Sequence, residues 1–162
     1  MASYAFNNSV GGSLVNLTSA TYKTTIIAGC VTGATTLRRI WLTELEWAAN
    51  DVPNATDCMI ATDISKFTAA GTATAIVPPG SDGLIDAAAL GTYAVNASVE
   101  PTFTATTSVF FKNINQRASD KQWWRDKATC PISPAVTANG LGVRHKSSNY
   151  ASTMVANVLV EE

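Results

Sequence analysis

Short stretches of alternating or β-branched residues, each ended by a turn signal, run along the whole chain. Thr, Val and Ile favour strands, and strand side chains point to opposite faces with a period of two. Gly, Pro and Asn-Asp clusters such as Asn50–Asn54 and Pro78–Gly80 separate the stretches. Strand-like stretches occupy residues 21–32, 36–48, 57–67, 72–77, 92–98, 106–116, 140–146 and 153–160.

This spacing predicts an all-β fold, either a jelly-roll or a β-sandwich, with about eight to ten short strands. A closed barrel fits the same spacing. The segment Asp86–Leu90, which ends before Gly91, predicts one short helical turn. The segment 121–125 contains Trp123-Trp124 in a polar setting.

Residues 36–48 give the clearest strand pattern. Uninterrupted alternation places Leu37, Trp41, Leu45 and Trp47 on one face, and Ile40, Leu42, Glu44 and Glu46 on the other. Leu and Glu also favour helices, but the stretch lacks a period of 3.6 residues. In residues 57–67, Cys58, Ile60 and Ile64 alternate with Asp63 and Ser65.

The chain of 162 residues fits one domain better than two. Residues 1–19 are rich in Asn, Ser and Gly, which predicts an N-terminal arm or loose lead-in. Residues 20–162 are then expected to form a single β-sandwich or jelly-roll domain.

The low charge of the chain limits which classes of partner it is expected to bind. Only 14% of the residues are charged, and the formal net charge is −1. A protein that binds nucleic acid usually carries a basic patch, and an anionic membrane also attracts basic segments. We therefore expect neither nucleic acid nor a membrane as a partner. No run approaches the roughly 18 apolar residues of a membrane helix, and the N-terminus lacks a signal-peptide pattern.

The candidate chemical groups are sparse. Cys30, Cys58 and Cys130 are odd in number and form no Cys-x-x-Cys pair, so they are expected to be small buried residues rather than a disulfide framework or zinc site. This use of cysteine suits a reducing cytoplasm. The single histidine, His145, lies between Arg144 and Lys146, which favours a solvated basic edge.

Glu44 and Glu46 lie two residues apart on one predicted face, about 6 to 7 Å from each other, so a catalytic carboxylate pair is geometrically possible. A solvated or interface face is the more ordinary explanation of the pair. Asp51, Asp57 and Asp63 do not have the spacing of a calcium loop, and Gly140-Leu-Gly142 lacks the third Gly of a dinucleotide motif. The sequence therefore predicts no catalytic, cofactor-binding or metal residues, and no enzyme.

Several phrases, taken in order, resemble a known family of virion proteins. They are Leu37-Arg-Arg-Ile-Trp-Leu-Thr-Glu-Leu-Glu-Trp47, Thr68-Ala-Ala-Gly-Thr-Ala-Thr-Ala-Ile-Val77, Asp86-Ala-Ala-Ala-Leu90, Glu100-Pro-Thr-Phe-Thr104, Ile114-Asn-Gln-Arg-Ala118, Asn139-Gly-Leu-Gly-Val-Arg144 and Val158-Leu-Val-Glu-Glu162. The chain resembles the jelly-roll capsid decoration, or cement, proteins of tailed bacteriophages over roughly residues 20–162.

The resemblance implies a structural protein of the virion. Such a protein folds in the cytoplasm of the bacterial host, binds the outer capsid surface and bridges copies of the major capsid protein, often as a trimer. It implies no catalytic residues. We expect residues 1–19, or the loops near Asn50 and Pro78, to touch the capsid, since an arm can add a strand to an open sheet edge. A homotrimer would cover exposed aromatic residues.

Two other functions stay open at this point. The chain fits another virion component, such as a head-fibre base, neck or tail part. It also fits a sandwich-type carbohydrate-binding module, in which Trp123, Trp124 or Trp41 would stack on sugars. The more ordinary role for these tryptophans is to fill the core, an edge or a subunit contact.

Overall fold

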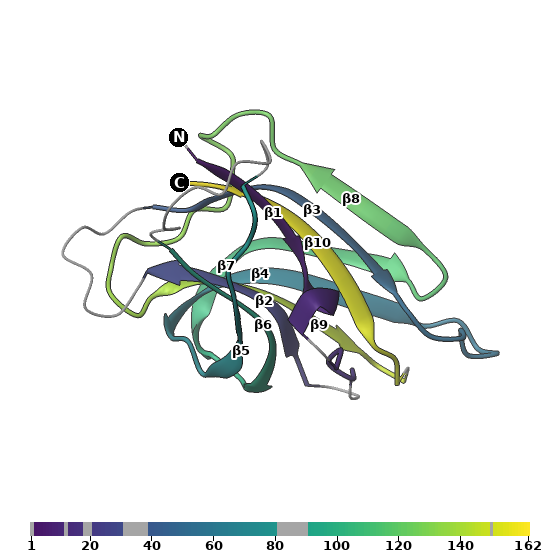
Figure 1. Cartoon of the computed structure of the whole chain (residues 1–162). Helices are drawn as coiled ribbons and strands as arrows, with labels where there is room; N and C mark the ends of the chain where they lie inside the picture. Colours follow the sequence, from purple (N-terminus) through teal and green to yellow (C-terminus); the bar gives the residue numbers. More distant parts are fainter. Residues whose placement is uncertain (1, 12, 18–20, 31–38, 81–90, 150) are drawn as a thin grey trace.

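A computed structural model describes residues 2–11, 13–17, 21–30, 39–80, 91–149 and 151–162. They form two antiparallel sheets packed face to face (Figure 1). The four-stranded sheet has the order β1 (Ser3–Asn7), β10 (Met154–Glu161), β3 (Trp41–Ala49) and β8 (Ser119–Trp123). The six-stranded sheet has the order β5 (Thr72–Ile76), β6 (Gly91–Val99), β2 (Lys23–Cys30), β9 (Gly140–Ser147), β4 (Met59–Ala69) and β7 (Thr102–Asn115). A 3₁₀ turn, η1 (Asn8–Gly11), follows β1.

The strand order is that of a jelly roll with one inserted hairpin. With β5 and β6 set aside, the remaining strands numbered in chain order run 1-8-3-6 in one sheet and 2-7-4-5 in the other. This is the double Greek-key arrangement of a jelly roll. The predicted all-β sandwich is therefore confirmed, and the described residues contain ten strands, within the expected number.

The inserted strands β5 and β6 curl the larger sheet around a second, smaller core. Only Ala70 and Gly71 connect β4 to β5, although these strands lie at distant positions in the sheet order. Gly71 has a φ of +68°, a left-handed conformation that suits glycine. Phe67 packs edge-on against Phe103 with ring centroids 6.3 Å apart. The buried members of this core are Ile27, Phe67, Ala94 and Ala97.

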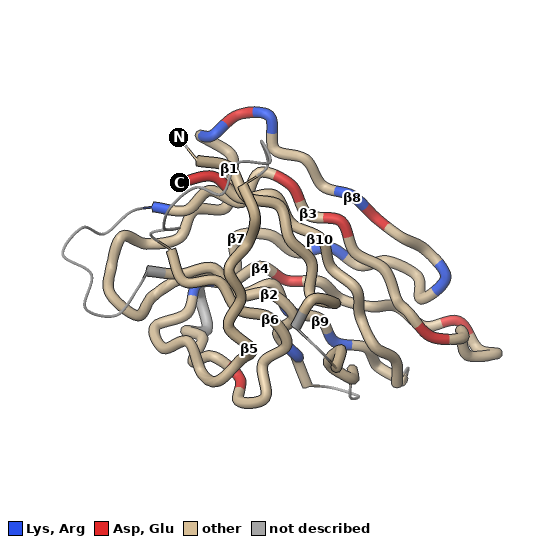
Figure 2. The backbone as a smooth tube through the Cα atoms, in the orientation of Figure 1, with Lys and Arg blue, Asp and Glu red and all other residues tan. Residues whose placement is uncertain are grey.

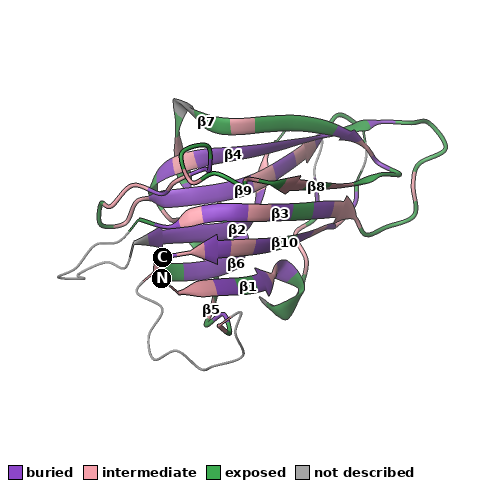
Figure 3. Ribbon diagram, turned by 90° about the horizontal axis from the view of Figure 1, so that it is seen from above, coloured by how far each residue is buried: buried purple, intermediate pink, exposed green. Residues whose placement is uncertain are grey.

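The main core lies between the two sheets. Its side chains come from the inward positions of both sheets, and Figure 3 shows buried residues concentrated on the central strands. The expected alternation explains β10, where buried and less buried residues follow one another without a break. Strands β7 and β8 lie at one side of the sandwich and are more exposed (Figure 3), while β1 and β5 lie at the other.

The alternation predicted for residues 36–48 is wrong at one point. Leu42 pairs with Val160 and Glu44 pairs with the adjacent Leu159, so Thr43 is an extra residue in β3. Such a bulge reverses the side-chain parity along a strand. Leu42 therefore faces the same core as Leu45 and Trp47, whereas Trp41 lies in the strand on the side of Glu44 and Glu46.

The N-terminal segment differs from the expected loose lead-in. Ser3–Asn7 pairs in full register with β10, and Tyr4 and Phe6 are buried in the main core. Further along, the amide of Leu17 donates to the carbonyl of Ser152. The alternation of Tyr4 and Phe6 with small or polar neighbours was the signal for a strand here. Residues 3–7 are thus an edge strand of the domain.

One observed strand was not predicted, and one predicted element is not tested. Residues 119–123 form a strand, β8, that the residue pattern did not predict. The helical turn expected at Asp86–Leu90 lies outside the described residues. The termini lie side by side (Figure 1), since the amide of Glu162 donates to the carbonyl of Ala2.

Candidate binding surfaces

His145 is not on a solvated edge, as the sequence suggested, but inside the sandwich. Its ring nitrogens Nδ1 and Nε2 lie 2.9 Å and 3.1 Å from the hydroxyls of Thr62 and Thr25. Complete burial lowers the pKa of His145 to about 3. The imidazole is therefore neutral at physiological pH and has no contact with solvent, so it holds three strands together rather than acting on a ligand.

Cys58 and Cys130 are buried. Desolvation raises the pKa of the Cys58 thiol, with a smaller contribution from Asp57. Desolvation also raises the pKa of Cys130, with a smaller contribution from Glu161. Both thiols are free. In the described ranges, no group of three or more His, Cys, Asp or Glu side chains could hold a metal ion.

A charged network that the sequence analysis missed lies on the six-stranded sheet. The Asp63 carboxylate is almost fully buried and accepts hydrogen bonds from Arg144 at 2.6 Å and from the hydroxyls of Ser65 and Ser108. The Arg144 guanidinium also stacks on Phe103, 4.2 Å from the ring centroid. A carboxylate inside the apolar stretch of β4 was the available signal, because a buried charge needs a partner. With its acceptors satisfied, Asp63 has a structural role.

Glu44 and Glu46 lie on the outer face of the four-stranded sheet. Lys121 on β8 forms an ion pair with Glu44, with a nitrogen–oxygen distance of 2.7 Å. Hydrogen bonding to Glu44 is the main cause that raises the pKa of Lys121. One carboxylate is thus neutralised by a lysine while Glu46 is exposed.

The three candidate tryptophans occupy different environments. Trp124 is partly buried and packs edge-on against Phe110, with ring centroids 5.4 Å apart. Trp123 pairs across from Glu44 and is 56% exposed. Trp41 is half-buried beneath the ammonium of Lys127, which lies 5.0 Å from the ring centroid. Trp123 is therefore the most exposed of the three, although the Arg125 guanidinium lies over its ring, 4.8 Å from the centroid.

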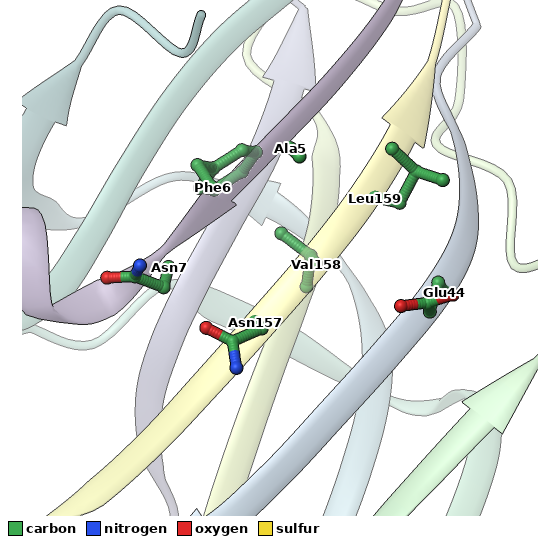
Figure 4. Close-up of a pocket in the computed structure, with 7 residues that line it drawn as sticks. All are labelled: Ala5, Phe6, Asn7, Glu44, Asn157, Val158 and Leu159. Atoms are coloured by element: carbon green, nitrogen blue, oxygen red, sulfur yellow. The ribbon is translucent and has the colours of Figure 1, made fainter. Parts of the chain in front are cut away.

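A shallow hollow of about 290 Å³ lies on this same outer face. Figure 4 shows Asn7 on β1, Asn157 on β10 and Glu44 on β3. Leu159, also on β10, lies between β1 and β3. The strand register places Ala5, Leu159, Glu44 and Trp123 in one row across the sheet. Asn7, Asn157, Glu46 and Lys121 form the next row. This face is mainly polar, and the apolar members of the first row, Ala5, Leu159 and Trp123, are interrupted by Glu44.

An apolar groove of about 410 Å³ lies at the β1/β5 side of the sandwich. One wall comes from β1 and η1, and the other comes from the end of β5 and the segment after it. The lining residues are Ala5, Phe6, Asn7, Val10, Ile76, Val77, Pro78 and Pro79. Val77 is 91% exposed and Val10 is also exposed. A bridge between Tyr4 and Gly80 joins the two walls at one end.

The groove brings together two of the three regions expected to touch a capsid. The N-terminal segment and the loop near Pro78 both line it. The third region, the loop near Asn50, holds the exposed Val52 and borders a separate polar hollow at Asn54–Cys58. Val10 and Val77, the exposed valines of the groove, are far apart in the sequence, so only the fold could show that they lie close together.

Comparison of the chain with protein-family models, with curated proteins and with solved structures finds no match. The fold and the surfaces therefore carry the functional argument. Within the described residues, no helix has the length and hydropathy needed to span a membrane.

Proposed function

We propose that this protein is a structural, non-enzymatic component of a tailed-phage virion that binds the outer capsid surface and bridges copies of the major capsid protein. The apolar groove between β1 and the segment after β5 is the observation that carries the proposal. A jelly roll alone is weak support, because one fold serves many functions. The groove supplies a specific place for a protein partner.

The chemistry of the groove fits an extended protein segment. Val10 and Val77 expose apolar side chains beside the polar side chain of Asn7. The groove also runs between two edge strands, β1 and β5. A segment that lies along a strand edge gains backbone hydrogen bonds, while apolar side chains fill the pocket beside it. The walls hold no charged residue, which fits a protein partner and not a nucleic acid.

Bridging explains how such a protein would stabilise a head. A ligand that binds the assembled shell and not its separated subunits shifts the equilibrium toward the shell. A homotrimer would present three grooves, and linked sites raise the apparent affinity well above that of one site. We therefore place the major capsid protein and two further copies of this chain among its partners.

The test is co-sedimentation of the purified protein with phage heads stripped of accessory proteins. We expect saturable binding and heads that survive more heat. Val77→Asp places a carboxylate in the groove and is expected to weaken binding by about tenfold or more, because the charge would be buried in an apolar contact. Val77 is exposed, so this variant should fold normally.

Two matched variants sharpen the assay. Val136→Asp changes another exposed valine outside the groove and is expected to bind as the unmodified protein does. Val52→Asp tests the loop near Asn50, where Val52 is 87% exposed. A loss confined to Val52→Asp would move the capsid contact to that loop. Absence of binding to every head form would refute the capsid role, and a monomeric mass in solution would refute a preformed trimer.

A further inference from the structure

We propose that the outer face of the four-stranded sheet binds a neutral oligosaccharide, with Trp123 as the stacking platform. This function is separate from capsid binding, because the face and the β1/β5 groove are different surfaces. Three features support this function: the exposed indole, the polar side chains in register with it and the small net charge around them.

Trp123 is the central observation. Its side chain is 56% exposed although it lies on a regular strand paired with β3. An exposed indole on a flat sheet offers an apolar surface that the C–H face of a pyranose ring can cover. The guanidinium of Arg125 lies over this ring, 4.8 Å from its centroid, so a sugar would stack on the part of the indole that Arg125 leaves open. Donors suited to sugar hydroxyls are therefore next to the platform.

Hydrogen-bonding side chains extend from Trp123 across the sheet. Glu44 lies directly opposite it on β3, and Glu46 is two residues further along the same strand. Asn157 pairs with Glu46, and Asn7 pairs with Asn157. These carboxylates and amides are spaced at about 5 Å between strands, which matches donors and acceptors to successive hydroxyls of a sugar chain.

Apolar side chains lie beyond Glu44 in the row that begins at Trp123. Leu159 pairs with Glu44, and Ala5 pairs with Leu159. Leu159 and Ala5 line the shallow hollow in Figure 4, which lies two strands away from Trp123. A ligand site with an apolar base and a polar rim suits a pyranose, which has both kinds of surface.

The charges of the face favour a neutral ligand. Figure 2 shows acidic and basic residues together along β3, β8 and the loop after β8. Lys121 pairs with Glu44, and Lys127 pairs with Glu161 at 2.6 Å. Glu46, Arg125 and Asp126 are then the remaining charges of the set, and they leave one net negative charge. The face therefore does not attract an anionic ligand, and its polar rows also differ from the apolar groove that we assign to protein.

The test is isothermal titration calorimetry of the full chain with cellohexaose, mannohexaose, maltohexaose, chitohexaose and an anionic control, oligogalacturonate. We expect saturable binding of at least one neutral oligosaccharide. Trp123→Ala is expected to weaken it by about tenfold or more. Asn157→Ala removes one exposed amide and is expected to weaken it by about fivefold.

Phe111→Ala is the matched control, because Phe111 is also 56% exposed but lies on β7 in the other sheet. Its affinity should equal that of the unmodified chain. The proposal is overturned if no neutral oligosaccharide binds, if only oligogalacturonate binds, or if Trp123→Ala binds as well as Phe111→Ala. Because the titration uses the free protein, its result does not depend on whether the chain binds capsids.

Discussion

Asn8 is expected to be among the most sensitive positions in the fold. Its side chain is fully buried where the chain leaves β1. The amide nitrogen donates to the carbonyl of Met154 at 2.8 Å and to Oδ1 of Asn96 at 3.0 Å. The amide oxygen accepts from the backbone N–H of Ala156 at 2.9 Å. The Asn8 side chain therefore extends the hydrogen bonding between β1 and β10, and it also links β10 to β6 in the other sheet.

The Asn8→Ala variant removes all three of these hydrogen bonds. Met154 and Ala156 are fully buried, so bulk water cannot take the place of the amide. A buried polar group without a partner costs about 1 to 3 kcal/mol. Water entering the space left by the amide would offset part of that cost. We expect the free energy of unfolding to fall by about 3 to 5 kcal/mol, a large share of the ~5 to 15 kcal/mol typical of a domain.

Urea unfolding followed by tryptophan fluorescence measures this loss, provided the slope with denaturant is unchanged. Asn157→Ala is the matched control: Asn157 is exposed on β10, and its loss should cost less than about 0.5 kcal/mol. A loss below about 1 kcal/mol in Asn8→Ala would refute the reasoning. It would mean that the N-terminal segment is detachable after all, as its composition suggested.

Three further perturbations test other parts of the structure. Arg144→Met leaves the buried Asp63 carboxylate without its cation, so the free energy of unfolding in urea should fall by about 3 to 5 kcal/mol. Part of this loss should be recovered in the double variant Asp63→Asn/Arg144→Met. Equal stability of Arg144→Met and the unmodified chain would contradict this expectation. Unfolded histidine binds a proton near pH 6.5 and His145 in the folded chain only near pH 3, so unfolding takes up a proton between these values. The free energy of unfolding should therefore drop by about 2 kcal/mol from pH 7 to pH 5, and a His145→Gln variant with the same pH dependence would count against this assignment. Gly71→Ala forces a side chain into the φ of +68° and places its Cβ 2.2 Å from the carbonyl oxygen of Val99. It should cost about 2 kcal/mol or more, and a loss under about 0.5 kcal/mol would show that the turn adapts.

The sequence predicts where the strands lie better than it predicts which strands pair with each other. All eight predicted stretches overlap observed strands, with boundaries shifted by a few residues, because turn residues and β-branched runs are local signals. The jelly-roll order depends on contacts between distant parts of the chain, such as Ser3 with Glu161, and no local pattern encodes them. The bulge at Thr43 shows the same limit, since an extra residue in β3 is defined only against β10.

Strand register also explains which predictions about single candidate residues were right and which were wrong. His145 has charged neighbours in sequence, but strand alternation turns Arg144 and Lys146 to the opposite face from His145. Trp123 and Trp124 are adjacent in sequence but point in different directions, so Trp123 is exposed while Trp124 packs against Phe110. The groove joins Val10 and Val77 only after folding. Residue types could therefore indicate candidates, whereas the face each one occupies required the strand register.

The edges of the two sheets explain why the groove is the expected place for an added strand. An unpaired edge risks unwanted association, and charged side chains commonly protect it. At the β7/β8 side, Lys112 and Asp120 form an ion pair at 2.6 Å that links the two edge strands. At the β1/β5 side, neither β1 nor β5 contains a charged residue, and exposed valines flank both. Within the described residues, one side of the sandwich thus carries charged edge residues and the other is apolar, which suits the capsid contact that we propose.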